Sequence, residues 1–226
     1  YTLTIAPDAA TERLISGNIS TTFGMIRFFG ADNVIIDGRF SGSGRYLRFR
    51  NINTTMPVFT LYNDATGNTI RNCIIEGANT VSTYGTIFFG TGLVTGNDNN
   101  TITENMIRDR SDAAGIPYQG IMSTGTTGFA NSDNTISNNE ILNFTTYGIQ
   151  ISATGNGSTW TITGNSVYYN NATLPTGTQY CIYFNPGAAS TGNTISGNFL
   201  GGSAANCGGS AWTNTGSAAT FAGILS

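Results

Sequence analysis

The sequence predicts an all-β chain folded as a right-handed parallel β-helix, a solenoid of about seven coils with three short strands in each coil. Three observations support this fold class. Gly, Asn, Thr and Ser are abundant, and these residues disfavour helices. An eight-residue element recurs at steps of 26 to 35 residues, without helical spacing. A short apolar strand follows each copy of that element.

The first strand of each coil, strand A, is predicted around an isoleucine that stands between polar residues. The copies of the element are NVIIDGRF (33–40), NTIRNCII (68–75), NTITENMI (100–107), NTISNNEI (134–141), WTITGNSV (160–167) and NTISGNFL (193–200). The central isoleucines are Ile5, Ile35, Ile70, Ile102, Ile136, Ile162 and Ile195. Because side chains alternate between the faces of a strand, we expect them to form one inward column.

The second strand, strand B, is predicted where another apolar residue recurs, five residues after the central isoleucine. These residues are Phe40, Ile75, Ile107, Ile141, Val167 and Leu200. Strand C completes each coil and is predicted in MIRFFG (25–30), VFTLYN (58–63), TIFFG (86–90), GIMS (120–123), GIQIS (148–152), CIYFN (181–185) and GILS (223–226). The right hand follows from the crossover preference of parallel strands.

A bend separates strands A and B, and small or polar residues recur there. The bend column is Gly38, Cys73, Asn105, Asn139, Asn165 and Asn198. We expect the four successive asparagines to form a ladder, in which each amide bonds to the coils above and below and so holds the register.

Residues 1–226 are predicted to form a single domain, because the composition is uniform and no linker interrupts it. The chain opens in strand A and closes in strand C, without a capping helix at either side. An open stack leaves unpaired backbone groups at both edges. We therefore expect a segment of a longer protein or a filament subunit, whose partners are neighbouring copies or flanking domains.

Charge and hydropathy exclude several function classes. The net charge is −3 and there is no His, so nucleic acid is not an expected partner. No apolar run is long enough to span a membrane, and no signal-peptide pattern is visible at Tyr1. No cofactor is predicted.

The coil pattern N-T-I-x-x-N-x-[IVL], followed by a G-I-x strand, resembles the right-handed β-helix repeat of the pectate lyase-like superfamily over essentially the whole chain. The pieces ADNVIIDG (31–38), GNDNNTIT (96–103), NSDNTISNN (131–139) and FLGGSAANCGG (199–209) are similar in texture to β-helical regions of very large bacterial proteins exported by the type IX system. The first resemblance implies the fold but no single activity. The second implies an extracellular stalk or adhesive module.

Enzymes of the pectate lyase-like superfamily typically use clustered Asp with Ca²⁺ and an Arg or Lys base, or paired Asp with a His-containing motif. This chain has no Lys and no His, and its acidic residues are scattered, so no catalytic residue is predicted. Arg108, Asp109, Arg110 and Asp112 form the densest charged cluster and are expected to be solvated ion pairs.

Four aspartates, Asp32, Asp64, Asp98 and Asp133, lie in the turns before strand A of consecutive coils. Stacked carboxylate and amide oxygens suit Ca²⁺. Their offsets from the central isoleucine differ, however, and turn formation explains them more simply. We therefore predict no metal site and keep Ca²⁺ as the alternative.

Two outer surfaces are candidates for binding. Strand A carries hydroxyl rows at Thr4, Thr69, Thr101, Thr135, Thr161 and Thr194, and at Thr103, Ser137, Thr163 and Ser196. Such a lattice is typical of ice-binding solenoids, but Arg71 interrupts it and β-propensity also explains it. The outward column of strand C offers a candidate interface with another chain or a glycan: Phe88, Met122, Gln150, Tyr183 and Leu225.

The three cysteines lack metal-ligand spacing. Cys73 is expected to be a small buried hydrophobe in the bend column. Cys181 opens one strand C and Cys207 lies in the loop before the next, so a disulfide between them is a candidate.

The leading hypothesis is a non-enzymatic, extracellular structural or adhesive module that assembles end to end or laterally. The alternative is a carbohydrate-binding or polysaccharide-cleaving β-helix protein, acting through the strand C face or the Arg108 loop. Ice binding through the threonine rows is a third.

Overall fold

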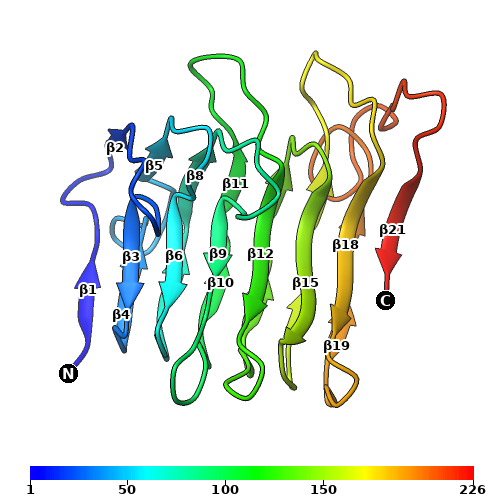
Figure 1. The fold of residues 1–226 in the computed structure, drawn as a ribbon. Helices are drawn as coiled ribbons and strands as arrows, with labels where there is room; N and C mark the ends of the chain where they lie inside the picture. Colours follow the sequence, from blue (N-terminus) through cyan, green and yellow to red (C-terminus); the bar gives the residue numbers. More distant parts are fainter.

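The chain forms a stack of seven coils, and the computed structural model describes all residues from 1 to 226. Each coil contributes one strand to each of three parallel seven-stranded sheets, which we name A, B and C (Figure 1). No helix is present, and so none is long and apolar enough to cross a membrane. The predicted fold class and number of coils are confirmed.

The three sheets follow the predicted strand series. Sheet A contains β1 (Leu3–Ile5), β4 (Val34–Asp37), β7 (Thr69–Arg71), β10 (Thr101–Thr103), β13 (Thr135–Ser137), β16 (Thr161–Thr163) and β19 (Thr194–Ser196). Sheet B contains β2 (Arg13–Gly17), β5 (Leu47–Asn51), β8 (Cys73–Gly77), β11 (Met106–Asp109), β14 (Glu140–Leu142), β17 (Ser166–Tyr168) and β20 (Phe199–Leu200). Sheet C contains β3 (Ile26–Phe29), β6 (Phe59–Tyr62), β9 (Ile87–Phe89), β12 (Gln119–Gly125), β15 (Tyr147–Gly155), β18 (Gln179–Pro186) and β21 (Phe221–Leu225).

The second coil departs from the predicted register. Ile36, not Ile35, pairs with Ile70 in the inward column, because two adjacent isoleucines fit the same pattern and only the structure distinguishes them. Ile36 is buried, whereas Ile35 joins the outward row that contains Thr69.

An inserted turn causes a second departure. Residues 38–46 loop out at the bend, where Phe40 and Ser43 bridge each other. The predicted place of Phe40 in sheet B is therefore taken by Phe49, which pairs with Ile75. Leu47, rather than Gly38, shares the register of Cys73.

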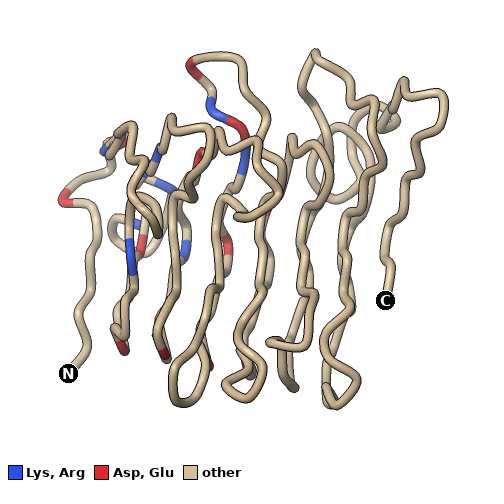
Figure 2. Tube along the Cα trace, in the orientation of Figure 1, with Lys and Arg blue, Asp and Glu red and all other residues tan.

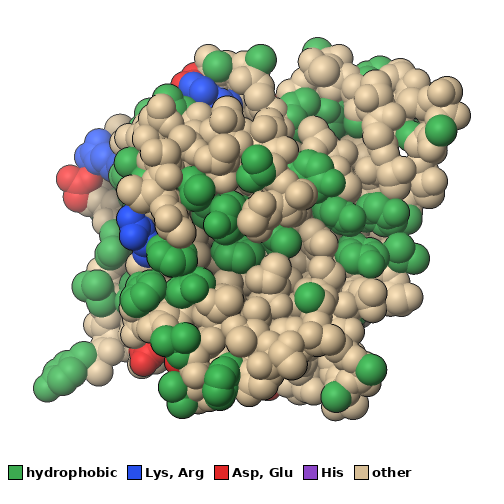
Figure 3. All heavy atoms as spheres, in the orientation of Figure 1, with side chains coloured by type: hydrophobic (Ala, Val, Ile, Leu, Met, Phe, Trp, Pro, Cys, Tyr) green, Lys and Arg blue, Asp and Glu red, His purple; other side chains and the backbone are tan.

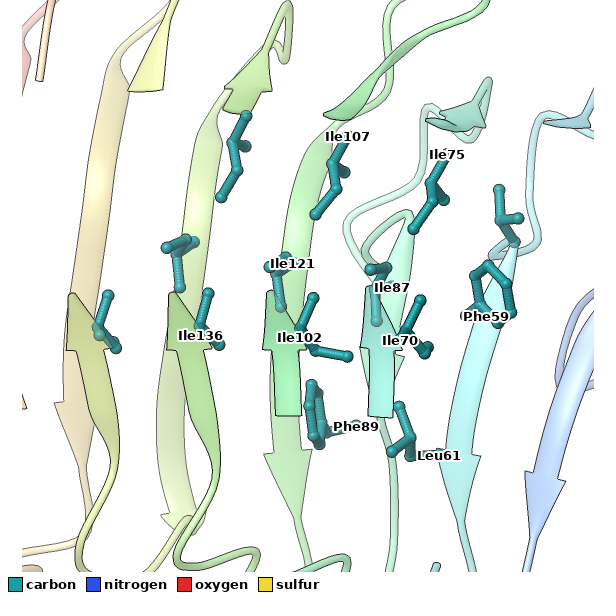
Figure 4. Close-up of a cluster of buried hydrophobic side chains, with 14 of the residues drawn as sticks. Phe59, Leu61, Ile70, Ile75, Ile87, Phe89, Ile102, Ile107, Ile121 and Ile136 are labelled. Atoms are coloured by element: carbon teal, nitrogen blue, oxygen red, sulfur yellow. The ribbon is translucent and has the colours of Figure 1, made fainter. Parts of the chain in front are cut away.

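The core is a continuous cluster of 27 buried residues between the three sheets. Isoleucines of successive coils stack in columns, as Figure 4 shows for Ile70, Ile102 and Ile136 of sheet A. Each fully buried aliphatic side chain contributes roughly 1.5–3 kcal/mol by leaving water. Because every coil repeats this burial, the stack is stabilised along its whole length.

Glycine in strand C permits the close approach of sheet C to its neighbours. A Cβ at Gly148 would lie 2.6 Å from the carbonyl oxygen of Cys181 and 2.8 Å from Cγ1 of Val167. Real Cβ atoms do not come this close, so a larger residue at this position would push the sheets apart.

Candidate functional site

The asparagine ladder occupies the bend between sheets A and B, at the positions that the repeat aligns. The Oδ1 of Asn139 accepts hydrogen bonds from the backbone N and Nδ2 of Asn105, at 3.0 and 3.1 Å. Asn165 Oδ1 accepts hydrogen bonds from the backbone N and Nδ2 of Asn139, and Asn198 Oδ1 accepts them from the same two groups of Asn165. The ladder is buried except at Asn198, and it locks the register of neighbouring coils.

A second ladder, which sequence reasoning missed, stands at the start of sheet A. Asn100 Oδ1 accepts from the backbone N and Nδ2 of Asn68, both at 3.0 Å, and Asn134 accepts likewise from Asn100. The asparagine that opens each N-T-I element is the sequence feature from which this second ladder could have been predicted. In the sixth coil Trp160 replaces it, and its indole donates to the carbonyl oxygen of Asn131 at 3.0 Å.

The outward column of strand C has the predicted register, but its centre is covered. Phe88 pairs with Met122, which pairs with Gln150, and the column continues to Tyr183 and Leu225. Phe88 and Met122 are only 7% and 8% exposed. The expectation that these two side chains are exposed is therefore wrong.

The loop before β9 explains the burial of Phe88. The ring of Tyr84 packs edge-on against Phe88, with the ring centroids 5.0 Å apart. Hydrophobic side chains still gather over the outer face of sheet C (Figure 3), with Gln150 and Tyr183 half-buried and Leu225 exposed.

A network of ion pairs crosses the outer face of sheet B, and sequence reasoning missed it. Glu76 is fully buried and pairs with both Arg48 and Arg50. Arg50 also reaches Asp112, at 2.8 Å. The register explains the network, since Arg50 stands beside Glu76, and Glu76 beside Arg108, in neighbouring strands.

The Arg108 cluster belongs to this network and is not simply solvated. Asp109 is buried and accepts hydrogen bonds from the Nδ2 groups of Asn143 and Asn171, both at 2.8 Å. Arg110 donates to Asp112, and this bond lowers the pKa of the Asp112 carboxyl to about 2. A carboxyl ionised in this way is a poor general acid at neutral pH.

Two loops project from the stack beside this cluster (Figure 1), and hollows in the protein surface form a groove between them. The loops join β11 to β12 and β17 to β18, and residues 143–146 lie between them. Three adjoining hollows of about 520, 280 and 390 Å³ form the groove. Its charged end contains Arg108 and Arg110, and its uncharged end contains Tyr118 and Tyr169.

The turn aspartates bond to protein groups of the next coil. Asp32 and Asp98 accept from the backbone N of Thr66 and Ser132, at 2.9 and 2.7 Å. Asp64 accepts from four backbone N–H groups of residues 93–96. No group of three or more His, Cys, Asp or Glu side chains is placed to hold a metal ion.

Burial raises the pKa of Asp98 to about 6, and the neighbouring carboxylates of Asp133 and Asp64 add to the shift. A carboxyl with this pKa titrates close to neutrality. Asp98 accordingly gains a proton when the pH falls through about 6.

The hydroxyl rows of sheet A have the predicted register. Thr101 stands beside Thr69 and Thr135, and Thr103 beside Ser137. Ser137 donates a hydrogen bond to Thr103 at 2.9 Å, so part of the row is satisfied within the protein.

All three cysteines are free thiols in this structure, so the predicted Cys181–Cys207 disulfide is not formed in it. Cys73 and Cys181 are buried and Cys207 is exposed. Burial raises the pKa of the Cys181 thiol to about 12, which makes it unreactive.

Comparison with known proteins gives a family but no individual relative. A family model described as a right-handed β-helix region matches residues 45–223. No curated protein and no solved structure matches the chain.

Proposed function

Because the chain belongs to the right-handed β-helix family, we propose that it is a non-enzymatic structural or adhesive module of an extracellular surface protein, whose coils stack end to end into a stalk or filament. The resemblance to type IX-exported proteins supports the extracellular location. The unbroken columns support the structural role, because a stack of this kind is rigid along its axis.

The observation that carries the proposal is the continuity of the inward columns from the first coil to the last. Ile5 and Ile224 belong to inward columns whose members in the second to sixth coils are buried. No charged residue follows Glu140, so the edge strands β19, β20 and β21 lack the charges that usually protect an edge from pairing (Figure 2).

The columns of the two edges also match. In a head-to-tail stack of two copies, each inward side chain of the last coil meets an apolar residue of the first coil in the same column. The matching pairs are Ile195 with Ile5, Leu200 with Ile15, and Ile224 with Ile26. Contact of these apolar side chains favours association.

Light scattering of residues 1–226 over a range of concentrations tests the proposal. We expect species larger than the 23.7 kDa monomer, and we expect Ile5→Asp and Ile224→Asp to suppress them. Leu93→Asp, at an exposed loop position away from the edges, is the control and retains assembly. A monomer at every concentration, or equal loss of assembly in the control, contradicts the proposal.

A second candidate function, carbohydrate binding, is favoured by the groove between the two projecting loops. Asn170, Asn171 and Tyr118 offer amide and aromatic groups of the kind that bind sugars. Cleavage is less favoured than binding, because the carboxylates at the groove are held in ion pairs. Titration with a panel of oligosaccharides measures carbohydrate binding at the groove, and Arg110→Ala is the test variant.

A further inference from the structure

A pocket on the outer face of sheet C is separate from the groove described above. It has a volume of about 380 Å³ and is lined by four aromatic residues and four threonines. The aromatic residues are Phe23, Tyr62, Tyr84 and Phe88. No residue lines both this pocket and the groove between the loops.

The absence of a side chain at Gly90 makes room for the pocket. A Cβ there would lie 2.6 Å from Cδ2 of Tyr62 and 3.0 Å from Cε1 of Phe88. Gly90 does not have a left-handed backbone, so conformation does not require glycine at this position. The glycine instead lets the Tyr62 ring lie over the strand and form one wall.

Phe23 packs against the Tyr62 ring and extends the same wall, at the cost of backbone strain. Phe23 has a φ of 97°, a conformation that bulky residues rarely adopt and that is found at functional sites. The Thr60 hydroxyl donates to the carbonyl oxygen of Phe23 at 2.6 Å and fixes this turn. The Phe23 ring consequently lies 4.5 Å from Tyr62, centroid to centroid.

The chemistry of the lining restricts the ligand. None of the eight lining residues is charged, so the pocket offers no partner for an ionic group. Aromatic rings provide apolar surface, and the threonine hydroxyls, including that of Thr124, both donate and accept hydrogen bonds. The volume lies within the range of small-molecule sites, about 300–1,000 Å³.

We propose that this pocket binds a neutral pyranose ring of a polysaccharide, with the C–H faces of the sugar against the aromatic walls and its hydroxyls against the threonines. Such a site would attach the β-helix to an uncharged glycan surface. It does not depend on the end-to-end assembly proposed above, because only Thr22 and Phe23 lie in the first coil and the other six lining residues lie in the second to fourth coils.

Isothermal titration calorimetry with cellohexaose, xylohexaose and mannohexaose tests the inference, with oligogalacturonate as the charged counterpart. We expect at least one neutral hexaose to bind, and Tyr84→Ala to weaken it by about tenfold or more. Phe23→Gly relieves the backbone strain and removes part of the wall that Phe23 forms with Tyr62, and we expect it to weaken binding while the protein stays folded. Phe129→Ala, an exposed aromatic outside the pocket, is the matched control.

Two results would overturn the inference. One is the absence of binding of all three neutral hexaoses by the unmodified protein up to about 10 mM. The other is binding that Tyr84→Ala and Phe23→Gly leave unchanged, or binding of oligogalacturonate that is equally sensitive to both variants. Light scattering on the same samples reports assembly separately, so failure of the pocket and failure of the structural role are distinguishable.

Discussion

Replacing Asn139 with alanine removes one full step of the asparagine ladder. Its Oδ1 accepts from the backbone N and Nδ2 of Asn105, and its Nδ2 donates to Ile102 O at 2.9 Å and to Asn165 Oδ1 at 3.0 Å. The substitution leaves the buried N–H of Asn105 without its acceptor. An orphaned buried group costs about 1–3 kcal/mol, and the other lost bonds add to this, so we expect destabilisation of about 3 kcal/mol.

Asn198 provides the comparison within the same ladder. It is half-buried and lies in the last coil, where water replaces the lost partners, so Asn198→Ala is expected to cost about 1 kcal/mol. Urea unfolding followed by far-UV circular dichroism gives both free energies. Equal losses for the two variants, or a loss below about 1 kcal/mol for Asn139→Ala, would refute the reasoning that burial gives the ladder its strength.

Three further predictions concern charge and thiols. Glu76→Ala removes the buried acceptor that Arg48 and Arg50 share, so that Arg48 keeps only Glu12 and the buried Arg50 keeps only Asp112 as a carboxylate partner. We expect this change to destabilise the fold by about 3 kcal/mol in urea unfolding, whereas Asp8→Ala, at an exposed pair, has no measurable effect; similar effects would show that the network is not buried in solution. Asp98 has a pKa of about 6 in the folded protein, above its value in the unfolded chain. The stability that the folded protein gains from holding this proton is therefore fully present below about pH 4 and is lost as the pH rises through 6. Asp98→Asn is accordingly expected to be more stable than the unmodified protein at pH 7 by about 1 kcal/mol after solvent screening, with no difference at pH 4, and a constant difference across this range would contradict the assignment. Cys207 is expected to react with a thiol reagent in the native protein while Cys181 stays protected, as peptide mass analysis would show; protection of both, reversed by a reductant, would establish the disulfide instead.

The repeat allowed the fold to be predicted because each coil carries the same inward pattern. Errors arose where the pattern was ambiguous. In the VII stretch, Ile35 and Ile36 both fit the strand, and only the pairing of Ile36 with Ile70 decides between them. The insertion 38–46 was invisible because Phe40 happened to satisfy the five-residue spacing.

The candidate sites were harder to predict, because they depend on loops whose path the repeat does not determine. Phe88 lies in the predicted column, yet the loop that carries Tyr84 covers it. Glu76 meets its two arginines through strand register, but the contact of Arg50 with Asp112 depends on the path of the loop after β11. Strand periodicity contains no information about either loop.

End-to-end stacking is tested most directly by cryo-electron microscopy of residues 1–226 at high concentration. The account predicts that the sheets of one copy continue into the next at the usual strand spacing of about 4.8 Å, with Ile195 over Ile5 and Ile224 over Ile26. Single particles whose two edges both face solvent would contradict it.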